Sequence, residues 1–519
     1  MNKNNTILWV DDEIELLRSH IIFLEEKGYS VKGVSSGEEG VGEIREHNYD
    51  LVFLDENMPG KDGIRTLQEI KAINMNLPVI MVTKNEEEGI MDQAIGLKID
   101  DYLIKPINPL QAYLAAKKIL QSSRIQKDTL SREYLEEFRR LDNLLDSDLD
   151  AQQWKNIHST LSRWDLELSD LSKTGLEQIH SDLKDRSNQK FSEFVVSNYR
   201  DWVNSEDRPV MTKDVFDRYT LPAVSEGKQV YLMVIDCMRY DQWLMIEDLL
   251  ADHYIINRDL IYSILPSATP YSRNAIFSGL YPIGIKQQYP QFWLERADDD
   301  GSGKNRFEME LMEEQLKSKG FGSIKSKYIK IYSNEDSAKI SDEIGSYKSL
   351  DLVAIVVNFL DMLSHGRSYI KLLQEIAPDE GAFRSLMRSW FIHSALFEIL
   401  QKIRKEGATV IITTDHGSVL CRKATMVKAN RETSTNLRYK FGENISCEEK
   451  HTYHVDNPRS IKLPAESPSK NYIFARSDYY FVYPTNFHKY ERQYRNTFQH
   501  GGISMEELII PCITLEPKF

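Results

Sequence analysis

The sequence predicts an α/β protein of three parts: a doubly wound N-terminal domain (residues 1–122), a central helical bundle (123–205) and a second α/β domain (206–519). In the first and third parts, apolar strand-like runs alternate with stretches whose apolar residues recur every three or four positions, which is typical of parallel sheets covered by helices. In the middle part the helical spacing continues without strand runs and almost without Gly or Pro. A chain of 519 residues is also too long for one hydrophobic core.

Composition limits the class of protein. The formal net charge of -14 argues against a general DNA binder. The four cysteines are scattered and form no C-x-x-C pair, which fits a reducing compartment. There is neither an apolar signal segment at the N-terminus nor a run of about 18 or more apolar residues. We therefore expect a soluble, cytoplasmic protein with no membrane association.

The first domain contains five apolar runs that read as the strands of one parallel sheet, at 7–10, 29–35, 50–55, 78–83 and 101–106. Doubly wound sheets place their functional sites beyond the carboxyl ends of the strands. Those ends carry Asp11, Asp12, Asp55, Thr83 and Lys105. Carboxylates that meet at one edge form a hard oxygen site suited to Mg²⁺. The hydroxyl and the lysine could bind the oxygens of a phosphoryl group on one of the carboxylates.

This stretch resembles, over its whole length, the receiver domain of two-component response regulators, through these five positions and the segment LDENMPG (54–60). The resemblance implies that Asp55 is the phosphorylated residue. It implies Mg²⁺ ligands, which are Asp11, Asp12, Asp55 and the main-chain carbonyl of Asn57. It also implies switch residues that respond to the phosphoryl group, which are Thr83, Tyr102 and Lys105.

The helical bundle at 123–205 would act as a rigid relay between the two α/β domains. Leu135, Phe138, Leu141 and Leu145 recur at helical spacing, and such residues are core positions more often than a binding stripe. We find no basic recognition helix, and acidic residues dominate the first half of the segment. We therefore expect no sequence-specific DNA binding, and the output function must lie further along the chain.

The third part carries a candidate nucleophile, Thr269, in the stretch LPSATPYSRNAIFSGLYP (265–282). A short polar turn leads there directly into an apolar helix. A threonine hydroxyl is a poor nucleophile at neutral pH unless a base or a metal takes its proton. The function of the domain therefore depends on the groups that surround this hydroxyl.

Candidate metal ligands recur where the apolar runs of this domain end. The runs 230–236, 350–361 and 408–417 each end in such residues, and two more histidines follow in SHGR and FQHGG. The six candidates are Asp236, Asp361, His365, Asp415, His416 and His500. Imidazole with carboxylate suits Zn²⁺, with Mn²⁺ as the alternative, and one zinc site takes about four ligands. We therefore predict two metals ~4 Å apart, one of which would also hold Thr269.

This constellation resembles the alkaline phosphatase superfamily over roughly 230–515, particularly its nucleotide pyrophosphatase/phosphodiesterase branch and the bacterial PglZ domains. The resemblance implies that Thr269, in PSATP, is the nucleophile. It implies that one zinc is bound by Asp236, Asp415 and His416, and the second by Asp361, His365 and His500. The Asn that usually binds the phosphoryl oxygen is missing downstream, where Lys286 or Asn274 could substitute. We find no arginine arrangement typical of monoesterases, which favours diesters such as nucleotides or oligonucleotides.

The whole chain resembles a group of response regulators linked to type IX secretion. That resemblance implies phosphorylation by a sensor histidine kinase, a homodimer when phosphorylated, and communication with a sigma factor. Two functions stay open. The first is a phosphorylation-controlled, zinc-dependent phosphodiesterase. The second is a non-enzymatic regulator that binds a sigma factor or a secretion component through the metal domain.

Overall fold

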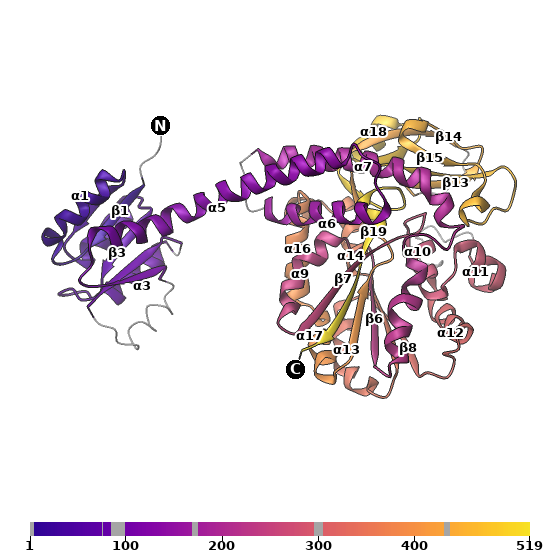
Figure 1. The fold of residues 1–519 in the computed structure, drawn as a ribbon, viewed down its shortest axis with the longest axis horizontal. Helices are drawn as coiled ribbons and strands as arrows, with labels where there is room; N and C mark the ends of the chain where they lie inside the picture. The colour runs from indigo at the N-terminus through magenta and orange to yellow at the C-terminus, as the bar shows by residue number, and fades with distance from the viewer. Residues whose placement is uncertain are drawn as a thin grey trace. The chain divides into compact units, whose positions relative to one another are not determined.

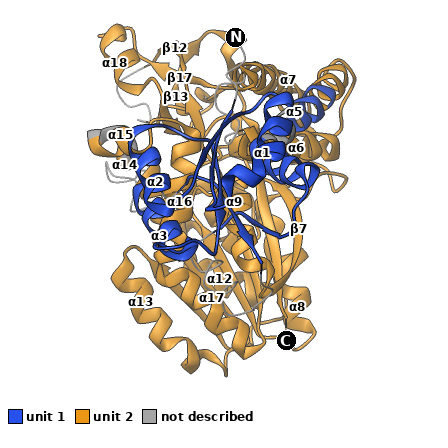
Figure 2. Ribbon diagram, turned by 90° about the vertical axis from the view of Figure 1, so that its left-hand side faces the viewer, with its two compact units in different colours: residues 1–136 blue, residues 137–519 orange. Residues whose placement is uncertain are grey.

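The computed structural model describes residues 5–74, 76–84, 99–168, 175–294, 305–429 and 436–518. Figure 1 shows the fold, with labels on many of its helices and strands. The chain divides into two compact units, residues 1–136 and 137–519, which are coloured separately in Figure 2 and described separately below. The predicted fold class is confirmed: a five-stranded parallel sheet, a helical middle region and a C-terminal mixed α/β domain are all present.

Unit 1 is built on a parallel sheet with strand order β2-β1-β3-β4-β5. Its strands are β1 (Thr6–Val10), β2 (Ser30–Val34), β3 (Leu51–Asp55), β4 (Val79–Thr83) and β5 (Asp101–Ile104), at the predicted positions. Alternate residues of β1 face opposite sides, because side chains alternate along a strand. Leu8 and Val10 pack with α2 (Gly37–Glu46) and α3 (Gly63–Ile73). Ile7 and Trp9 pack with α1 (Arg18–Glu26) and the start of α5 (Pro109–Leu144).

The helical middle region consists of the last part of α5, α6 (Ala151–Glu167) and α7 (Leu176–Trp202). A capping box of Asp150 and Gln153 begins α6, satisfying backbone N–H groups of its first turn. The apolar side chains of these helices, such as Leu141, Trp154 and Phe191, share one core with the C-terminal sheet. The helices therefore pack as part of unit 2.

Unit 2 contains a six-stranded sheet with strand order β7-β19-β10-β6-β9-β8. The strands are β6 (Val230–Ile235), β7 (Tyr254–Tyr262), β8 (Ser326–Ile331), β9 (Leu352–Val357), β10 (Thr409–Thr413) and β19 (Ile509–Pro517). The four strands from β10 to β8 are parallel, whereas β19 runs antiparallel to both of its neighbours. Helices cover both faces, with α6, α7, α9 (Tyr240–Ala251) and α17 (Ala395–Glu406) on one side and α10 (Thr269–Ser278) and α12 (Glu308–Ser318) on the other.

One predicted strand is shorter than expected. The run 350–361 forms β9 only as far as Val357, and Asp361 lies in the first turn of α14 (Phe359–Tyr369). The prediction that Asp361 ends this strand is therefore wrong. The apolar run continues from the strand into the helix, so composition alone does not show where the backbone changes direction.

Three small sheets follow β10 in the chain, with orders β11-β18, β14-β12-β17 and β13-β16-β15. Their strands are β11 (Val419–Cys421), β12 (Lys423–Lys428), β13 (Tyr439–Glu443), β14 (Ser446–Cys447), β15 (Thr452–Val455), β16 (Lys470–Ala475), β17 (Tyr479–Val482) and β18 (Thr497–Gln499). The remaining helices of unit 2 are α8 (Leu221–Ser225), α11 (Pro282–Gln288), α13 (Asn334–Glu343), α15 (Lys371–Ile376), α16 (Glu380–His393), α18 (Phe487–Tyr494) and α19 (Met505–Leu508). Among the residues described, no helix combines the length and the apolar character needed to cross a bilayer.

Candidate metal centres

The first acidic cluster lies at the carboxyl edge of the sheet in unit 1. Ligand atoms of Asp11, Asp12 and Asp55 lie within 4.8 Å of one another. The Lys105 Nζ is 2.9 Å from Asp11 Oδ2 and 3.0 Å from Asp55 Oδ1. Burial raises the pKa of Asp55 to about 6, and the nearby charge of Asp11 adds to the rise, while the hydrogen bond from Lys105 opposes it. An oxygen-only cluster of this kind fits Mg²⁺.

The neighbouring residues of this cluster occupy the ends of β4 and β5. The Thr83 hydroxyl donates a hydrogen bond to the carboxylate of Glu56, the residue that follows Asp55. The Tyr102 side chain is 44% exposed, and Asn57 is exposed as well. Gly63 is required after the loop, because a Cβ at this position would lie 2.4 Å from the Asp55 carbonyl oxygen. The switch roles of Thr83, Tyr102 and Lys105, and the Asn57 carbonyl as a ligand, stay predictions.

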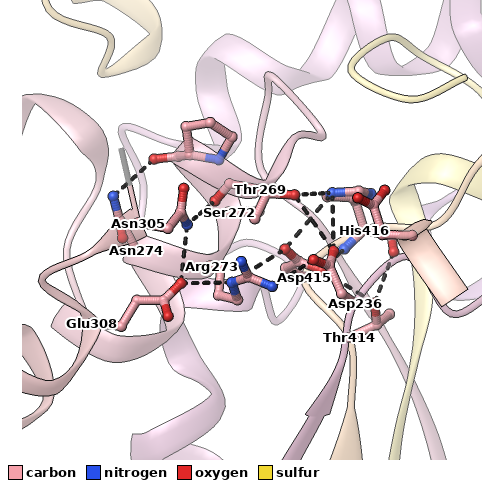
Figure 3. Close-up of polar contacts among 12 residues, drawn as sticks. Asp236, Thr269, Ser272, Arg273, Asn274, Asn305, Glu308, Thr414, Asp415 and His416 are labelled. Carbon is pink, nitrogen blue, oxygen red and sulfur yellow. Dashed lines mark hydrogen bonds and ion pairs between the residues drawn. The ribbon is translucent and has the colours of Figure 1, made fainter. Parts of the chain in front are cut away.

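In unit 2, Thr269 is the first residue of helix α10. Its Oγ1 lies 2.9 Å from His416 Nε2 and 3.5 Å from Asp236 Oδ1, as Figure 3 shows. The residue is half-buried, whereas Asp236 and His416 beside it are buried. Pro270 follows at the start of the helix, where its missing N–H costs no hydrogen bond. The hydroxyl therefore sits at the positive end of a helix dipole, beside electron-rich side chains.

Asp236, Asp415 and His416 form a second cluster, in which all three side chains are buried and offer ligand atoms within 4.8 Å of one another. The His416 Nδ1 is 3.0 Å from the Gly417 carbonyl oxygen. This contact fixes the proton on Nδ1 and leaves the lone pair of Nε2 directed towards Thr269. Two strand ends, those of β6 and β10, bring these residues together.

The donors of this cluster fit a zinc ion. Burial raises the pKa of Asp236 to about 8; the charge of Arg273 opposes the rise, and the charge of Asp415 adds to it. Burial also lowers the pKa of His416, which keeps the imidazole neutral as a metal ligand requires. Two buried carboxylates that repel each other beside a neutral imidazole match the mixed oxygen and nitrogen ligands of zinc sites.

The second predicted ligand set is described only in part. The His500 Nε2 lies 3.7 Å from Asp361 Oδ1, and the His500 ring stacks on His416 with centroids 4.1 Å apart. The structure thus brings Asp361 and His500 next to the first set. His365 lies on α14 with Asp361, but its side chain is outside the described residues. A second zinc bound by Asp361, His365 and His500 therefore stays a prediction.

Sequence reasoning missed Arg273 and Glu308, which are both buried beside the nucleophile (Figure 3). The Arg273 Nη1 lies 2.6 Å from Asp236 Oδ2, and its Nε lies 2.6 Å from Glu308 Oε1. Asn305 connects the pair to the nucleophile, because its amide donates to the carbonyl of Thr269 and to Glu308, each at 3.0 Å. The spacing of four residues from Thr269 to Arg273 is a signal that could have found the arginine. The Arg273 guanidinium is bound to two carboxylates, so it does not test the prediction of a diester substrate, which stays a prediction.

The two candidate phosphate-orienting residues lie in different places. Asn274 is buried on α10, where its amide donates to the Pro270 carbonyl at 3.0 Å. Lys286 lies on α11, and burial lowers its pKa, with the nearby charges of Lys470 and Arg459 adding to the effect. A role for either residue at the phosphoryl group stays a prediction.

Comparison with known families divides the chain in the same order. Residues 7–116 match the response regulator receiver domain, residues 124–203 match the PorX response regulator linker domain, and residues 215–515 match the BREX system PglZ alkaline phosphatase-like domain. A receiver domain implies a partner histidine kinase, and domains related to alkaline phosphatase typically use metals.

Curated relatives match only the N-terminal part. The transcriptional regulatory protein ResD of Bacillus subtilis is 36% identical over 115 residues, which are 22% of this chain and 48% of ResD. A CpxR homolog of Haemophilus influenzae is 37% identical over 127 residues, 24% of this chain and 54% of that protein. The chain thus spans about half the length of these relatives. A crystal structure of a two-component response regulator from Clostridium difficile is 32% identical, covering 23% of this chain and 97% of that one, with a TM-score of 0.22.

The PglZ match covers more than half of the chain, and the receiver and linker matches precede it in order. The chain therefore belongs to the PglZ alkaline phosphatase-like family, and it is a PorX-like two-component response regulator with a receiver, a PorX linker and a PglZ domain.

Proposed function

We propose that the PglZ domain of this response regulator is a zinc-dependent phosphodiesterase, with Thr269 as its nucleophile and phosphorylation of Asp55 as its control. The observation that carries the proposal is the position of the Thr269 hydroxyl, 2.9 Å from His416 and 3.5 Å from Asp236. A half-buried hydroxyl among buried metal-type ligands is suited to attack on phosphorus.

Each residue near Thr269 would have a separate role in this reaction. When bound, two zinc ions would supply positive charge for the attacking and leaving oxygens. Thr269 Oγ1 would lose its proton to solvent and form a bond to phosphorus while the bond to the leaving oxygen breaks, and that oxygen would take up a proton to leave as the alcohol. Water would then add to phosphorus as the bond to Oγ1 breaks, and one of its protons would restore the Thr269 hydroxyl. Arg273 holds the Asp236 carboxylate through Nη1, and Glu308 holds Arg273 from the other side. Thr269 is also the first residue of α10, so the positive end of the helix dipole would favour the negative charge of a phosphoryl group there.

We place nucleotide or oligonucleotide diesters first among the substrates. A narrow hollow, with room for little more than one water molecule, is lined by residues that include several aromatic rings and one cation: Pro270, Tyr271, Asn274, Trp293, Leu294, Phe441, Pro464, Lys470 and Tyr472. The cations Lys286, Lys470 and Arg459 lie near one another in an otherwise acidic protein. Aromatic rings and clustered cations together suit bases and phosphates.

The experiment compares hydrolysis of bis(p-nitrophenyl) phosphate by the wild type, Thr269→Ala and Thr269→Ser, with and without a zinc chelator. We expect loss of activity in Thr269→Ala and in chelator, and retention of part of it in Thr269→Ser, which keeps a hydroxyl. A Thr269→Ala variant as active as the wild type would contradict the mechanism. A monoester, p-nitrophenyl phosphate, tests the preference for diesters.

The wider setting is proposed from the PorX linker match: a cytoplasmic protein that becomes a homodimer when phosphorylated, communicates with a sigma factor and regulates type IX secretion. Co-purification of the sigma factor with the wild type, and its loss in Asp55→Ala, would support this setting.

A second candidate function, protein binding without catalysis, is favoured by one observation. Met362, Ile370, Leu372 and Ile376, on and between α14 and α15, expose half or more of their surface. Exposed apolar side chains on and after the helix that carries Asp361 are of the kind that bind partner proteins. Partner capture that Leu372→Asp abolishes and Thr269→Ala leaves unchanged would favour this function.

A further inference from the structure

Helix α7 of the linker makes a buried polar contact with the turn that carries the nucleophile. The backbone N–H of Leu265 donates a hydrogen bond of 2.7 Å to the hydroxyl oxygen of Tyr199. Leu265 directly precedes the segment PSATP (266–270), which contains Thr269. Tyr199 is 1% exposed, so no water can replace this acceptor easily. The linker therefore helps to fix where the nucleophile turn begins.

The same helix contacts a second turn, the short helix α19, through Asn188. The Asn188 amide donates to Glu506 Oε2 at 2.9 Å, and its carbonyl oxygen accepts the Met505 N–H at 2.8 Å. Lys184, one turn earlier on α7, lies 3.7 Å from Glu506 Oε1. Asn188 is buried, and both of its polar atoms are used in holding α19.

Helix α19 in turn supports the loops that carry two candidate zinc ligands. The Gly417 N–H, next to His416, donates to the Glu507 carbonyl at 3.2 Å. The fit there is tight, because a Cβ on Gly417 would lie 1.9 Å from the Glu506 carbonyl oxygen. Glu507 Oε1 also accepts the N–H of Gly502 at 2.9 Å, two residues after His500. Helix α19 thus contacts both the loop that carries His416 and the loop that carries His500.

The nucleophile turn and the His500 loop are joined directly as well. The Ser267 hydroxyl donates to the Gly502 carbonyl at 2.9 Å and accepts the Gly501 N–H at 3.2 Å. Movement of α7 would therefore act on a connected set of turns rather than on separate loops. Metal sites respond strongly to such outer contacts, with typical losses of roughly 10–100-fold when they are removed.

We propose that α7 is a positioning element of the zinc site, with Asn188 and Tyr199 as positioning residues that set the geometry of His416, His500 and Thr269. The inference rests on the proposed function for its activity readout but not for its zinc readout. In the chain, α7 lies between the receiver and the PglZ domain. A displacement of the linker would therefore move the contacts that position the candidate zinc ligands His416 and His500.

The test measures zinc binding and diester hydrolysis by the full chain. Zinc chloride is titrated into chelator-stripped protein by calorimetry, and kcat and KM are measured with bis(p-nitrophenyl) phosphate. For Asn188→Ala we expect zinc affinity and kcat to fall by about 10-fold or more while KM changes by less than about 3-fold. Asn198→Ala is the matched control, because Asn198 lies on the same helix but donates within it, to Phe194. This control should match the wild type.

A charge exchange separates positioning from simple stabilisation. Asn188→Asp alone places two carboxylates together and should weaken zinc binding. Asn188→Asp with Glu506→Gln reverses the hydrogen bond between the same positions, so it should restore zinc affinity to within about 3-fold of the wild type. If the Asn188 variants fail to fold, Tyr199→Phe tests the same inference. It keeps the aromatic ring, removes only the hydroxyl that accepts from Leu265, and should lower kcat.

Three results would overturn the inference. Wild-type zinc affinity and kcat in Asn188→Ala, with only a lower Tm, would leave the residue a purely stabilising role. A loss that the double variant does not restore, or equal losses in Asn198→Ala, would contradict it as well. If the wild type hydrolyses no diester, the proposed function fails, whereas the zinc titrations still decide the role of α7.

Discussion

The two acidic clusters of this protein lie at equivalent places, the carboxyl edges of parallel strands, yet they differ in chemistry. The receiver cluster offers only oxygens and includes one exposed member, Asp12. The PglZ cluster replaces one carboxylate by His416 and buries all three of its members. Exposure lets water complete the shell of a hard ion such as Mg²⁺, whereas a dry site with an imidazole suits zinc.

The two clusters also differ in how cations balance their charge. Lys105 contacts Asp11 and Asp55 directly with a single ammonium group. Arg273 lies between Asp236 and Glu308 and binds them with different nitrogens of its planar guanidinium. A flexible point charge can release a carboxylate that must accept a phosphoryl group. A rigid bridging group instead keeps a metal ligand in one orientation.

The largest expected effect is that of zinc removal. A zinc-selective chelator, or His416→Ala, should lower diester hydrolysis by at least about 1,000-fold, because the buried carboxylates then lack their cation. Phosphorylation of Asp55 by acetyl phosphate in excess Mg²⁺, followed by mass spectrometry, should be unchanged. Equal loss of both activities would show that the two clusters are not independent.

Two glycine variants should separate the clusters next. Gly417→Ala meets the Glu506 carbonyl at 1.9 Å and should lower diester hydrolysis by about 100-fold, with phosphorylation preserved. Gly63→Ala meets the Asp55 carbonyl at 2.4 Å and should impair phosphorylation while hydrolysis by the PglZ domain persists. Both reactions are measured in both variants. Impaired phosphorylation in Gly417→Ala, or impaired hydrolysis in Gly63→Ala, would argue against separate sites.

Removal of Arg273 should have a smaller but general effect on the PglZ domain. Arg273→Gln leaves Asp236 without its ion-pair partner, and breaking a buried pair costs about 3–5 kcal/mol. We expect a lower Tm and a decrease in kcat of roughly 10–100-fold. Arg273→Lys keeps the charge but cannot bridge both carboxylates. Its Tm and kcat should lie between those of the wild type and those of Arg273→Gln. Wild-type stability in Arg273→Gln would show that the bridge contributes little.

The smallest expected effect concerns the receiver. The pKa of Asp55 is raised from 3.8 to about 6, so the folded receiver favours the protonated carboxyl group. The stability that Asp55 contributes to the folded state is therefore largest below pH about 4, and it is lost as the pH rises through about 6. In magnesium-free buffer near pH 7.5, Asp55→Asn should therefore slow hydrogen exchange in β1 and β3, by about 1–2 kcal/mol of opening free energy. The difference should shrink below pH about 5. An equal difference at both pH values would contradict this origin.

The strands, and the meeting of Asp236, Asp415 and His416, could be predicted because parallel strands end at one edge and apolar runs mark them. Asp361 was placed wrongly because its apolar run passes from β9 into α14. The geometry near Asp361 and His500 still brings the two residues together.

Other parts of the site could not be predicted from a single sequence. Glu308 reaches Arg273 from α12, and no spacing in the chain connects the two residues. The contacts of Asn188 and Tyr199 join helix α7 to turns far along the chain. Buried polar contacts between distant segments follow from tertiary packing. A single asparagine or tyrosine in a sequence does not indicate which distant segment it will contact.

The position of β19 has a consequence for the order in which the protein matures during synthesis. This strand, Ile509–Pro517, pairs with β7 and β10 and joins them, so the large sheet stays incomplete until these residues have left the ribosome. The receiver, in contrast, draws its sheet from residues 6–104 alone. N-terminal domains generally fold first on the ribosome. A nascent chain can therefore complete the sheet of its receiver before it completes the sheet whose strand ends carry Asp236, Asp415 and His416.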